Sequence, residues 1–407
     1  MTTKTASTGS PGTGNPGTGN PGTGSHWASL FSSAKAAVIV GFASTILVVI
    51  EGLRAVGANP EQQASAAAVL CFAMAITSFI LAVRYRLPIM VAWSTPGAVL
   101  LATSGGGITF PQAIGAFIAA GGLMVLTAVI TPLARAIERM PASIAAAMLA
   151  GVLLRYVLGV PPAALASPQY VVPLVLAFFA LRFVVPMYTV PVIVALGLLL
   201  AGLGGSFSGG VTMAVTPLTF DWPEWNLQAV ISIGLPLYLV TMASQNLPGF
   251  AVLRANGYQP PVSACLLVTG IGSILAAPFG SHAVNLAAIT ASMVAGPDAH
   301  PDPGQRWKMI YPYTVLYVIF GLAAGTFVAL LGALPKDLVT AIAGLALFAP
   351  LMGGISAMMK QPKEIEAALV TFLTTASGIT LFGIGAAFWG LLAGLTLWTI
   401  QRAARRI

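Results

Sequence analysis

Long apolar runs alternate with short polar connections along most of the chain, a pattern typical of a polytopic membrane protein. A helix needs about 20 apolar residues to cross a bilayer, and fourteen runs reach or approach that length. The polar stretch 205–226 divides them into two sets of seven. We therefore expect an all-α fold with 14 transmembrane segments, at 34–53, 63–83, 88–104, 111–131, 142–160, 170–185, 188–204, 227–248, 261–277, 279–296, 310–333, 338–358, 364–382 and 384–401.

The two sets of seven segments are predicted to form an inverted repeat. Seven is odd, so the second half must enter the membrane upside down relative to the first. The first segment begins near 34 and the eighth near 227, about 193 residues later. Breaks in the third and tenth segments, at 93–97 and 280–285, are separated by a similar length. The lengths thus indicate a 7+7 arrangement.

Composition agrees with a membrane location. The chain is 57% hydrophobic and only 7% charged, whereas soluble domains carry about 25% charged residues. Cys71 and Cys265 lie inside apolar runs and predict neither a disulfide nor a metal site. Residues 9–25 instead repeat Pro-Gly-Thr-Gly-Asn without apolar content, so residues 1–30 are expected to be a disordered cytoplasmic tail. This tail lacks the features of a signal peptide.

The positions of lysine and arginine predict the orientation, because cytoplasmic loops are enriched in these residues. With a cytoplasmic N-terminus, fifteen of the 18 basic residues fall on the cytoplasmic side. Only Arg54, Lys336 and Arg155, which is near the end of the fifth segment, fall outside. We expect the protein to lie in the inner membrane. Both of its termini are then expected on the cytoplasmic side. The basic residues are dispersed between apolar spans, so the net charge of +8 does not indicate a nucleic-acid partner.

Two segments are interrupted by helix-breaking and polar residues. One contains Pro88–Gly97 and the other Ala277–Asn285. Backbone that leaves a helix at membrane depth must find polar partners in protein or a cavity, and paired breaks of this kind indicate a transporter's substrate site. The alternative is a pair of proline kinks packed against neighbouring helices.

The residues at the breaks favour an anion site. Ser94 and Thr95 suit a helix N-cap with Pro96 in the first turn, so a helix is expected from about residue 95. Residues 280–283 are predicted to repeat the arrangement ahead of a helix through Ala287. Two helix N-termini facing each other would bind an anion without a buried lysine or arginine.

The eighth segment carries polar side chains at helical spacing. Thr241, Ser244 and Gln245 are expected to share one face, and Asn246 follows directly. In the tenth segment, Asn285 marks the point where the polar break gives way to helix. Amides inside a membrane helix face protein, water or ligand, so these residues either contact substrate or join helices to one another.

Two titratable residues are candidates for proton coupling. His282 is the only histidine within a predicted segment, and its charge can change near neutral pH. It could equally donate a hydrogen bond to the broken backbone. Glu51 lies toward the outer end of the first segment, and Arg54 three residues later could instead make an ordinary ion pair with it.

The sequence gives no support for an enzyme. It has no nucleophile-elbow pattern, no histidine-rich metal spacing and no phosphate-binding loop for ATP-driven transport. We expect neither a cofactor nor a metal. An anion channel remains an alternative to a carrier.

Three stretches resemble the benzoate/proton symporters of the BenE type: Pro88–Gly97, Leu239–Gly249 and Phe279–Asn285. The resemblance extends from about 34 to 402. It implies a layout similar to the uracil and sulfate permeases, with segments 3 and 10 each half strand and half helix, and it is compatible with a homodimer. It also implies a core domain of segments 1–4 and 8–11 and a gate domain of segments 5–7 and 12–14. The corresponding ranges are 31–140 and 227–335 for the core, and 141–226 and 336–407 for the gate.

One departure from the related uracil permeases concerns charge. Those relatives carry acidic residues on the eighth and tenth segments, where this chain has Ser244, Gln245, Asn246 and Asn285. Neutral amides suit an anionic carboxylate, which an acidic side chain would repel. The proton's route then rests on Glu51 or His282, or the proton accompanies the substrate.

The resemblance and the residues together predict import of an aromatic carboxylate, benzoate, by proton symport with alternating access. A nucleobase or inorganic-anion transporter of the same fold is the alternative, besides the channel. The predicted substrate-binding residues are Trp93, Ser94, Thr95, Gly97, Ser244, Gln245, Asn246, Phe279, Ser281, His282 and Asn285. Trp93 and Phe279 are expected to contact the aromatic ring.

Overall fold

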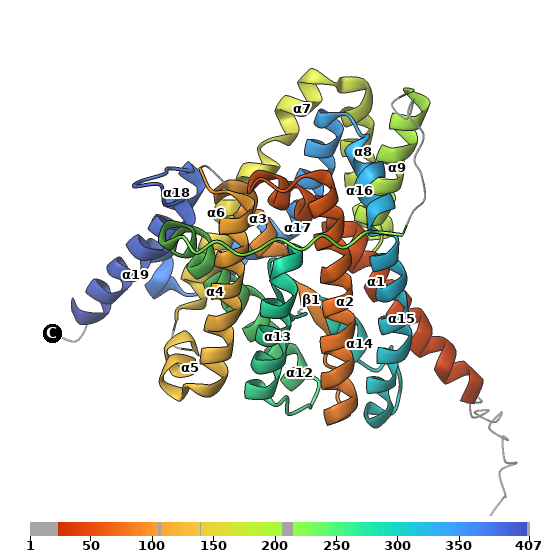
Figure 1. The fold of residues 1–407 in the computed structure, drawn as a ribbon, viewed down its shortest axis with the longest axis horizontal. Helices are drawn as coiled ribbons and strands as arrows, with labels where there is room; N and C mark the ends of the chain where they lie inside the picture. Colours follow the sequence, from red (N-terminus) through yellow and green to blue (C-terminus); the bar gives the residue numbers. More distant parts are fainter. Residues whose placement is uncertain (1–22, 105–106, 139, 206–214, 288, 405–407) are drawn as a thin grey trace, which may run out of the picture.

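The computed structural model describes residues 23–104, 107–138, 140–205, 215–287 and 289–404, which are mostly helical (Figure 1). The first half contains α1 (Thr23–Ala55), α2 (Pro60–Tyr85), β1 (Val91–Trp93), α3 (Thr95–Ser104), α4 (Phe110–Val129), α5 (Thr131–Glu138), α6 (Ala142–Val157), α7 (Val160–Ala166), α8 (Pro168–Val184) and α9 (Thr189–Leu203). The second half begins with α10 (Leu227–Ala229), the π-helical turn η1 (Val230–Gly234), α11 (Leu235–Thr241), the π-helical turn η2 (Met242–Asn246), α12 (Leu247–Ala255), α13 (Val262–Ala276), the 3₁₀ turn η3 (Ala277–Phe279), β2 (Val284–Leu286) and α14 (Ile289–Ala295). It ends with the 3₁₀ turn η4 (Pro303–Met309), α15 (Ile310–Leu322), α16 (Ala324–Gly332), α17 (Lys336–Met358), the 3₁₀ turn η5 (Pro362–Glu364), α18 (Ile365–Ser377) and α19 (Ala386–Ala404).

Several helices are long and apolar enough to cross a membrane. Within the described residues there are seven such helices, or eight when α15 and α16, which meet at a bend of 53°, count as one span. The seven are Trp27–Ala55, Pro60–Tyr85, Phe110–Val129, Ala142–Ala166, Leu227–Ala255, Val262–Phe279 and Lys336–Met358. The polytopic helical fold is therefore confirmed, whereas the count of 14 segments and the inverted repeat stay predictions.

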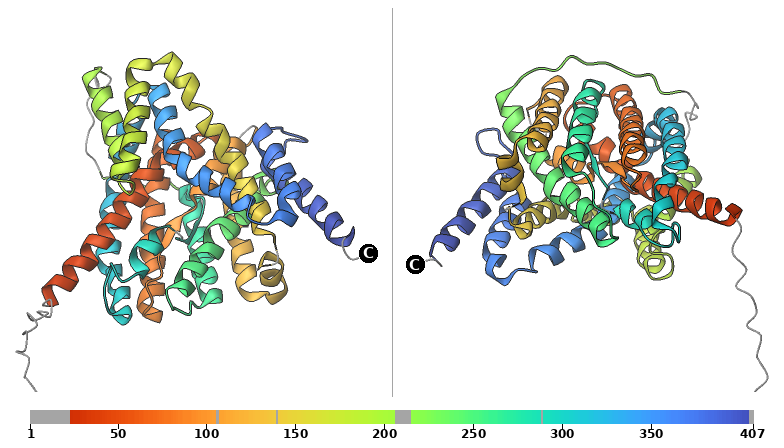
Figure 2. Two further views of the ribbon diagram at one scale, coloured as in Figure 1. Left: turned by 180° about the vertical axis from the view of Figure 1, so that it is seen from behind. Right: turned by 90° about the horizontal axis from the view of Figure 1, so that it is seen from below.

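The helices pack in two groups (Figure 2). In the first group, α2 packs on α15 and α16, α4 packs on α13 and η1, and α1 packs on α3. In the second group, α6 packs on α17 and α18, α18 packs on α19, and α8 packs on α9 and α17. The two groups meet where α1 contacts α9 and α17 and where α3 contacts α6. Helices α1 and α3 thus lie along the boundary between the groups.

The connection between the halves lies across the first group of helices. Residues 215–226 have no regular secondary structure and run over the starts of α2 and α4 (Figure 1). The main-chain N–H of Asp221 donates to the carbonyl oxygen of Pro278 at 2.8 Å, and that of Glu224 donates to Pro111 at 3.0 Å. The Asp221 carboxylate accepts from Gln62 at 2.8 Å. These bonds join the connection to three separate helices.

The N-terminal tail expected at residues 1–30 extends further along the chain than the structure allows. Residues 1–22 lie outside the described residues, but α1 already begins at Thr23. Leu30 is buried, and the Ser29 hydroxyl donates to the carbonyl oxygen of Ala299 at 3.1 Å. Residues 23–30, which the sequence analysis assigns to the tail, thus belong to α1, and Ser29 and Leu30 are held by contacts with the rest of the protein.

Candidate functional site

The two interrupted segments meet in a small antiparallel sheet. Strands β1 and β2 pair with Val91 opposite Leu286, Ala92 opposite Asn285 and Trp93 opposite Val284. Beyond the ladder, the Ser94 N–H donates to the Ala283 carbonyl at 3.1 Å. The extended backbone at these breaks thus finds its hydrogen-bond partners in protein, as membrane depth requires. Two breaks far apart in sequence form one structural unit.

Ser94 caps the helix that follows β1. Its hydroxyl accepts from the Gly97 N–H at 3.1 Å and lies 2.8 Å from the hydroxyl of Thr241. The predicted helix start after Ser94 is therefore confirmed. A Cβ at Gly97 would meet Leu237 and would lie 2.8 Å from the Ser94 hydroxyl oxygen. Ser94 and Gly97 accordingly shape the start of α3, and both are already in contact with protein atoms.

The second break differs from its prediction. Residues 280–283 were expected directly ahead of a helix, but β2 follows them and α14 begins only at Ile289. Gly280 has a φ of +88° and ends the turn η3, and pairing with β1 then keeps residues 284–286 extended. Ser281 therefore lies before the strand and not at a helix N-terminus. It is buried, and its hydroxyl has no hydrogen-bond partner among the described residues.

His282 connects the two interrupted segments. It is fully buried, and its Nε2 lies 2.9 Å from the carbonyl oxygen of Ser94. A carbonyl can only accept, so Nε2 carries the proton in this contact. Its Nδ1 has no hydrogen-bond partner among the described residues. The imidazole thus retains one nitrogen that can gain a proton.

The polar residues of the eighth segment, which the sequence predicts to share one face, make different contacts. Thr241 contacts Ser94, while the Ser244 hydroxyl donates to the Val240 carbonyl of its own helix. Asn246 accepts from the Leu286 N–H at 2.9 Å and so fixes β2. Ser244, Gln245 and Asn246 lie in the π-helical turn η2, which ends two residues before Pro248. Gln245 lines the cavity described below.

Asn285 also holds the breaks together. In the orientation that satisfies its amide, its oxygen accepts from the Ser94 N–H at 3.2 Å and its nitrogen donates to the Leu286 carbonyl at 2.9 Å. The side chain is fully buried. Like Asn246, it supports the sheet.

A cavity of about 110 Å³ lies beside the sheet, at mid-depth of α1. It is lined by Val40, Gly41, Ser44, Thr45, Met74, Ala92, Trp93, Thr95, Gln245, Ala287, Thr290 and Tyr317, and we call it the central cavity. None of these residues is charged. The Thr290 hydroxyl has no partner among the described residues, and Thr95 opens α3, whose N-terminal end is electropositive. The cavity therefore combines neutral polar groups, a helix N-terminus and apolar walls.

Three of the predicted binding residues line the central cavity: Trp93, Thr95 and Gln245. The indole of Trp93 donates to the Thr45 hydroxyl at 2.7 Å, which fixes the ring in the wall. Sequence reasoning missed Ser44, Thr45, Thr290 and Tyr317, although polar residues within apolar segments are a signal for such positions.

Phe279 and Glu51 lie elsewhere. The ring of Phe279 packs on Phe220, at 5.5 Å between centroids, and does not line the central cavity. Glu51 makes an ion pair of 2.8 Å with Arg54, the ordinary alternative considered for it, and lines a separate cavity. Among the described residues no group of three or more His, Cys, Asp or Glu could hold a metal.

The chain matches a known family over nearly its whole length. The family model described as "Benzoate membrane transport protein" matches residues 25–400. The inner membrane protein YdcO of Escherichia coli is 38% identical over 361 residues, covering 88% of this chain and 92% of that protein. The benzoate membrane transport protein of Acinetobacter baylyi is 31% identical over 371 residues, covering 89% and 93%.

A solved structure shares the fold. The transmembrane domain of a cyanobacterial bicarbonate transporter, BicA, aligns with a TM-score of 0.59 at 12% identity. The alignment covers 91% of this chain and 97% of that domain. At this identity the likeness concerns the fold alone.

Proposed function

The chain belongs to the benzoate membrane transport (BenE) family, and from this premise we propose that it imports benzoate together with protons by alternating access. Membership makes it a membrane transporter and not an enzyme. The observation that carries the proposal is the meeting of the two interrupted segments in one sheet beside the central cavity.

The size of the central cavity favours a ligand with a single ring. An engineered protein cavity of about 150 Å³ accommodates benzene, and the central cavity measures about 110 Å³. A benzoate ion therefore fits after a small outward movement of the walls, whereas a two-ring substrate needs far more space. The ring of Trp93 and the side chain of Met74 provide apolar surface.

The polar groups of the central cavity suit a carboxylate. In the proposed complex the carboxylate lies at the N-terminal end of α3, near Thr95, and accepts hydrogen bonds from Gln245 and Thr290. Pro96 has no N–H and the N–H groups of Gly97 and Ala98 are bonded to Ser94, so α3 offers the Thr95 N–H and the positive end of its dipole. Since no acidic residue lines the cavity, nothing there repels the substrate.

His282 is the proposed coupling residue. A positive charge on a fully buried imidazole is costly without a nearby anion. His282 contacts Ser94, which directly precedes Thr95 at the proposed carboxylate position. The proton on Nδ1 and the substrate carboxylate then stabilise each other, so that both bind and both leave together.

The two helix groups supply the moving parts. We propose that the group containing α1–α4 and α10–α16 is the core, and that the group containing α6–α9 and α17–α19 is the gate. The central cavity lies on the core helices α1 and α3, which border the gate. Sliding of the core along the gate would expose the cavity to either side of the inner membrane, with both termini in the cytoplasm.

Transport by the purified protein tests this function. Proteoliposomes are loaded at alkaline pH, and uptake of radiolabelled benzoate is followed with and without an inward proton gradient. We expect accumulation above equilibrium only with the gradient, and competition by unlabelled benzoate but not by uracil or sulfate. Equal uptake in both conditions would remove symport, and voltage-driven currents far above carrier turnover would favour a channel.

A further inference from the structure

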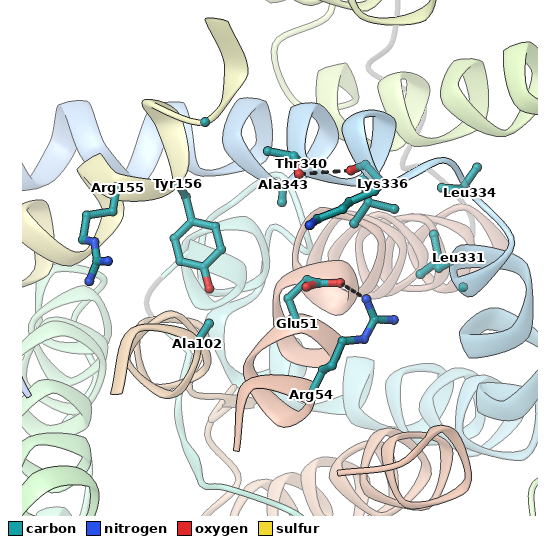
Figure 3. Close-up of a pocket in the computed structure, with 13 residues that line it drawn as sticks. Glu51, Arg54, Ala102, Arg155, Tyr156, Leu331, Leu334, Lys336, Thr340 and Ala343 are labelled. Carbon is teal, nitrogen blue, oxygen red and sulfur yellow. Dashed lines mark hydrogen bonds and ion pairs between the residues drawn. The ribbon is translucent and has the colours of Figure 1, made fainter. Parts of the chain in front are cut away.

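The three basic residues that the orientation places outside come together in one cavity. Arg54, Arg155 and Lys336 lie far apart in sequence, yet all three line a cavity of about 610 Å³ (Figure 3). We call it the outer cavity. It is a pocket with three cationic side chains and one carboxylate, that of Glu51. Basic residues are disfavoured on the outer side, so this convergence points to a local role for their charge.

The outer cavity lies between the two helix groups. Glu51 and Arg54 come from the end of α1, and Ala102 from the end of α3. Across the cavity, Arg155 and Tyr156 come from α6, and Lys336, Thr340 and Ala343 come from α17 (Figure 3). Its shape therefore changes when one group moves against the other.

The outer cavity has more positive than negative side chains. Arg54 is held by Glu51 at 2.8 Å. Neither Arg155 nor Lys336 makes an ion pair within the described ranges. The formal charge of the lining is thus +2, in a recess where the surrounding protein strengthens its field. Such a recess attracts a small anion.

The same helices connect the outer and central cavities. Ser44 of the central cavity and Glu51 of the outer cavity lie seven residues apart on one face of α1, about 10 Å along the axis. On α3, Thr95 and Ala102 have the same spacing. The fully buried Val48 lies between the two positions on α1. The outer cavity therefore lies about two helical turns along α1 from the central cavity, with Val48 between them.

We propose that the outer cavity is a docking site for the substrate's carboxylate, which binds Arg155 and Lys336 before it enters the central cavity. Glu51 occupies Arg54 until the substrate arrives, and the incoming carboxylate competes with it for this arginine. The identity of the ligand rests on the proposed function, whereas the affinity of the cavity for anions does not.

Cysteine labelling from outside intact cells tests this docking site. Thr340→Cys places a thiol in the outer cavity at a half-buried position, while the native Cys71 and Cys265 are buried. We compare the rates at which this thiol reacts with two membrane-impermeant methanethiosulfonates, an anionic one (sulfonatoethyl) and a cationic one (trimethylammonioethyl). We expect the anionic reagent to be favoured, and R155Q/K336Q to lower this preference about tenfold. The variant R155K/K336R should retain it, and R84Q, on the other side of the membrane, should leave it unchanged.

Benzoate protection identifies the ligand. Millimolar benzoate should slow labelling of Thr340→Cys, and should still do so in the Q245L background, where the central cavity is impaired. An unchanged reagent preference in R155Q/K336Q would overturn the anion site, even if benzoate transport is normal. A charge-dependent preference without benzoate protection, in a protein that transports benzoate, would overturn docking and assign the cations to lipid headgroups. Absence of benzoate transport by the unaltered protein would instead refute the proposed function. The uptake assay measures this separately.

Discussion

The carbonyl oxygen of Ser94 accepts a hydrogen bond from Nε2 of His282 at 2.9 Å, across 188 residues of sequence. This bond ties the start of α3 to the second interrupted segment. It also leaves Nδ1 of His282 as the atom that can take up a proton. Any change in the charge of this ring is therefore felt at the N-terminal end of α3, where we place the substrate's carboxylate.

Replacing His282 should separate proton coupling from substrate binding. The variant H282Q keeps an N–H donor for the Ser94 carbonyl but cannot be protonated. We expect it to lose benzoate accumulation driven by a pH gradient while it still exchanges labelled for unlabelled benzoate across the membrane. E51Q is the matched control and should retain the gradient response. Gradient-driven accumulation by H282Q at the level of the unaltered protein would contradict this role.

Gln245 and Ser244 are neighbours with different expected roles. Q245L removes an amide that lines the central cavity, and a hydrogen bond to a charged group contributes about 1.5–3 kcal/mol. We expect the benzoate KM to rise at least about tenfold. S244A should change it little, because the Ser244 hydroxyl donates to its own helix. Concentration-dependent uptake into proteoliposomes measures both, and similar values for the two variants would argue against substrate contact by Gln245.

Asn246 should matter for the integrity of the sheet. N246A leaves the buried Leu286 N–H without its acceptor, which costs about 1–3 kcal/mol. We expect a lower melting temperature of the detergent-solubilised protein. Q228A removes an exposed amide bonded to the Gly383 carbonyl, and it should shift melting far less. Equal melting temperatures would show that β2 is held by other contacts.

Gly97 should tolerate no side chain. The variant G97A places a methyl group against Leu237 and the Ser94 hydroxyl, and overpacking of this kind costs about 1–3 kcal/mol. In the control G122A the added methyl meets nothing within 4 Å. Thermal unfolding should therefore report a loss for G97A and little change or a gain for G122A. Substantial destabilisation by G122A would indicate that the loss of stability in G97A does not arise from contact with Leu237 and Ser94.

The sequence predicted where the two segments are interrupted more accurately than it predicted the backbone structure that follows each interruption. Proline, glycine and serine have strong local preferences, so the helix start after Ser94 could be predicted. The pairing of Val284–Leu286 with β1 is a long-range contact, and it delays the start of α14 in a way that no local preference reveals. The π-helical turn Met242–Asn246 is likewise a departure from the regular α-helix on which the predicted spacing of Thr241, Ser244 and Gln245 depended.

The residues of the outer cavity were each noted in the sequence, but the sequence did not indicate that they lie together. Arg54, Arg155 and Lys336 were each identified as exceptions to the charge distribution. Their proximity depends on the packing of α1 against α17 and of α3 against α6. Only the tertiary structure could therefore convert three separate exceptions into one cationic surface.

A structure of the full-length protein in lipid nanodiscs with saturating benzoate tests the central claim most directly. We predict ligand density in the central cavity, with the carboxylate at the N-terminal end of α3 beside Thr95 and Gln245. Density for bound benzoate at another place, with the central cavity still closed, would contradict the account.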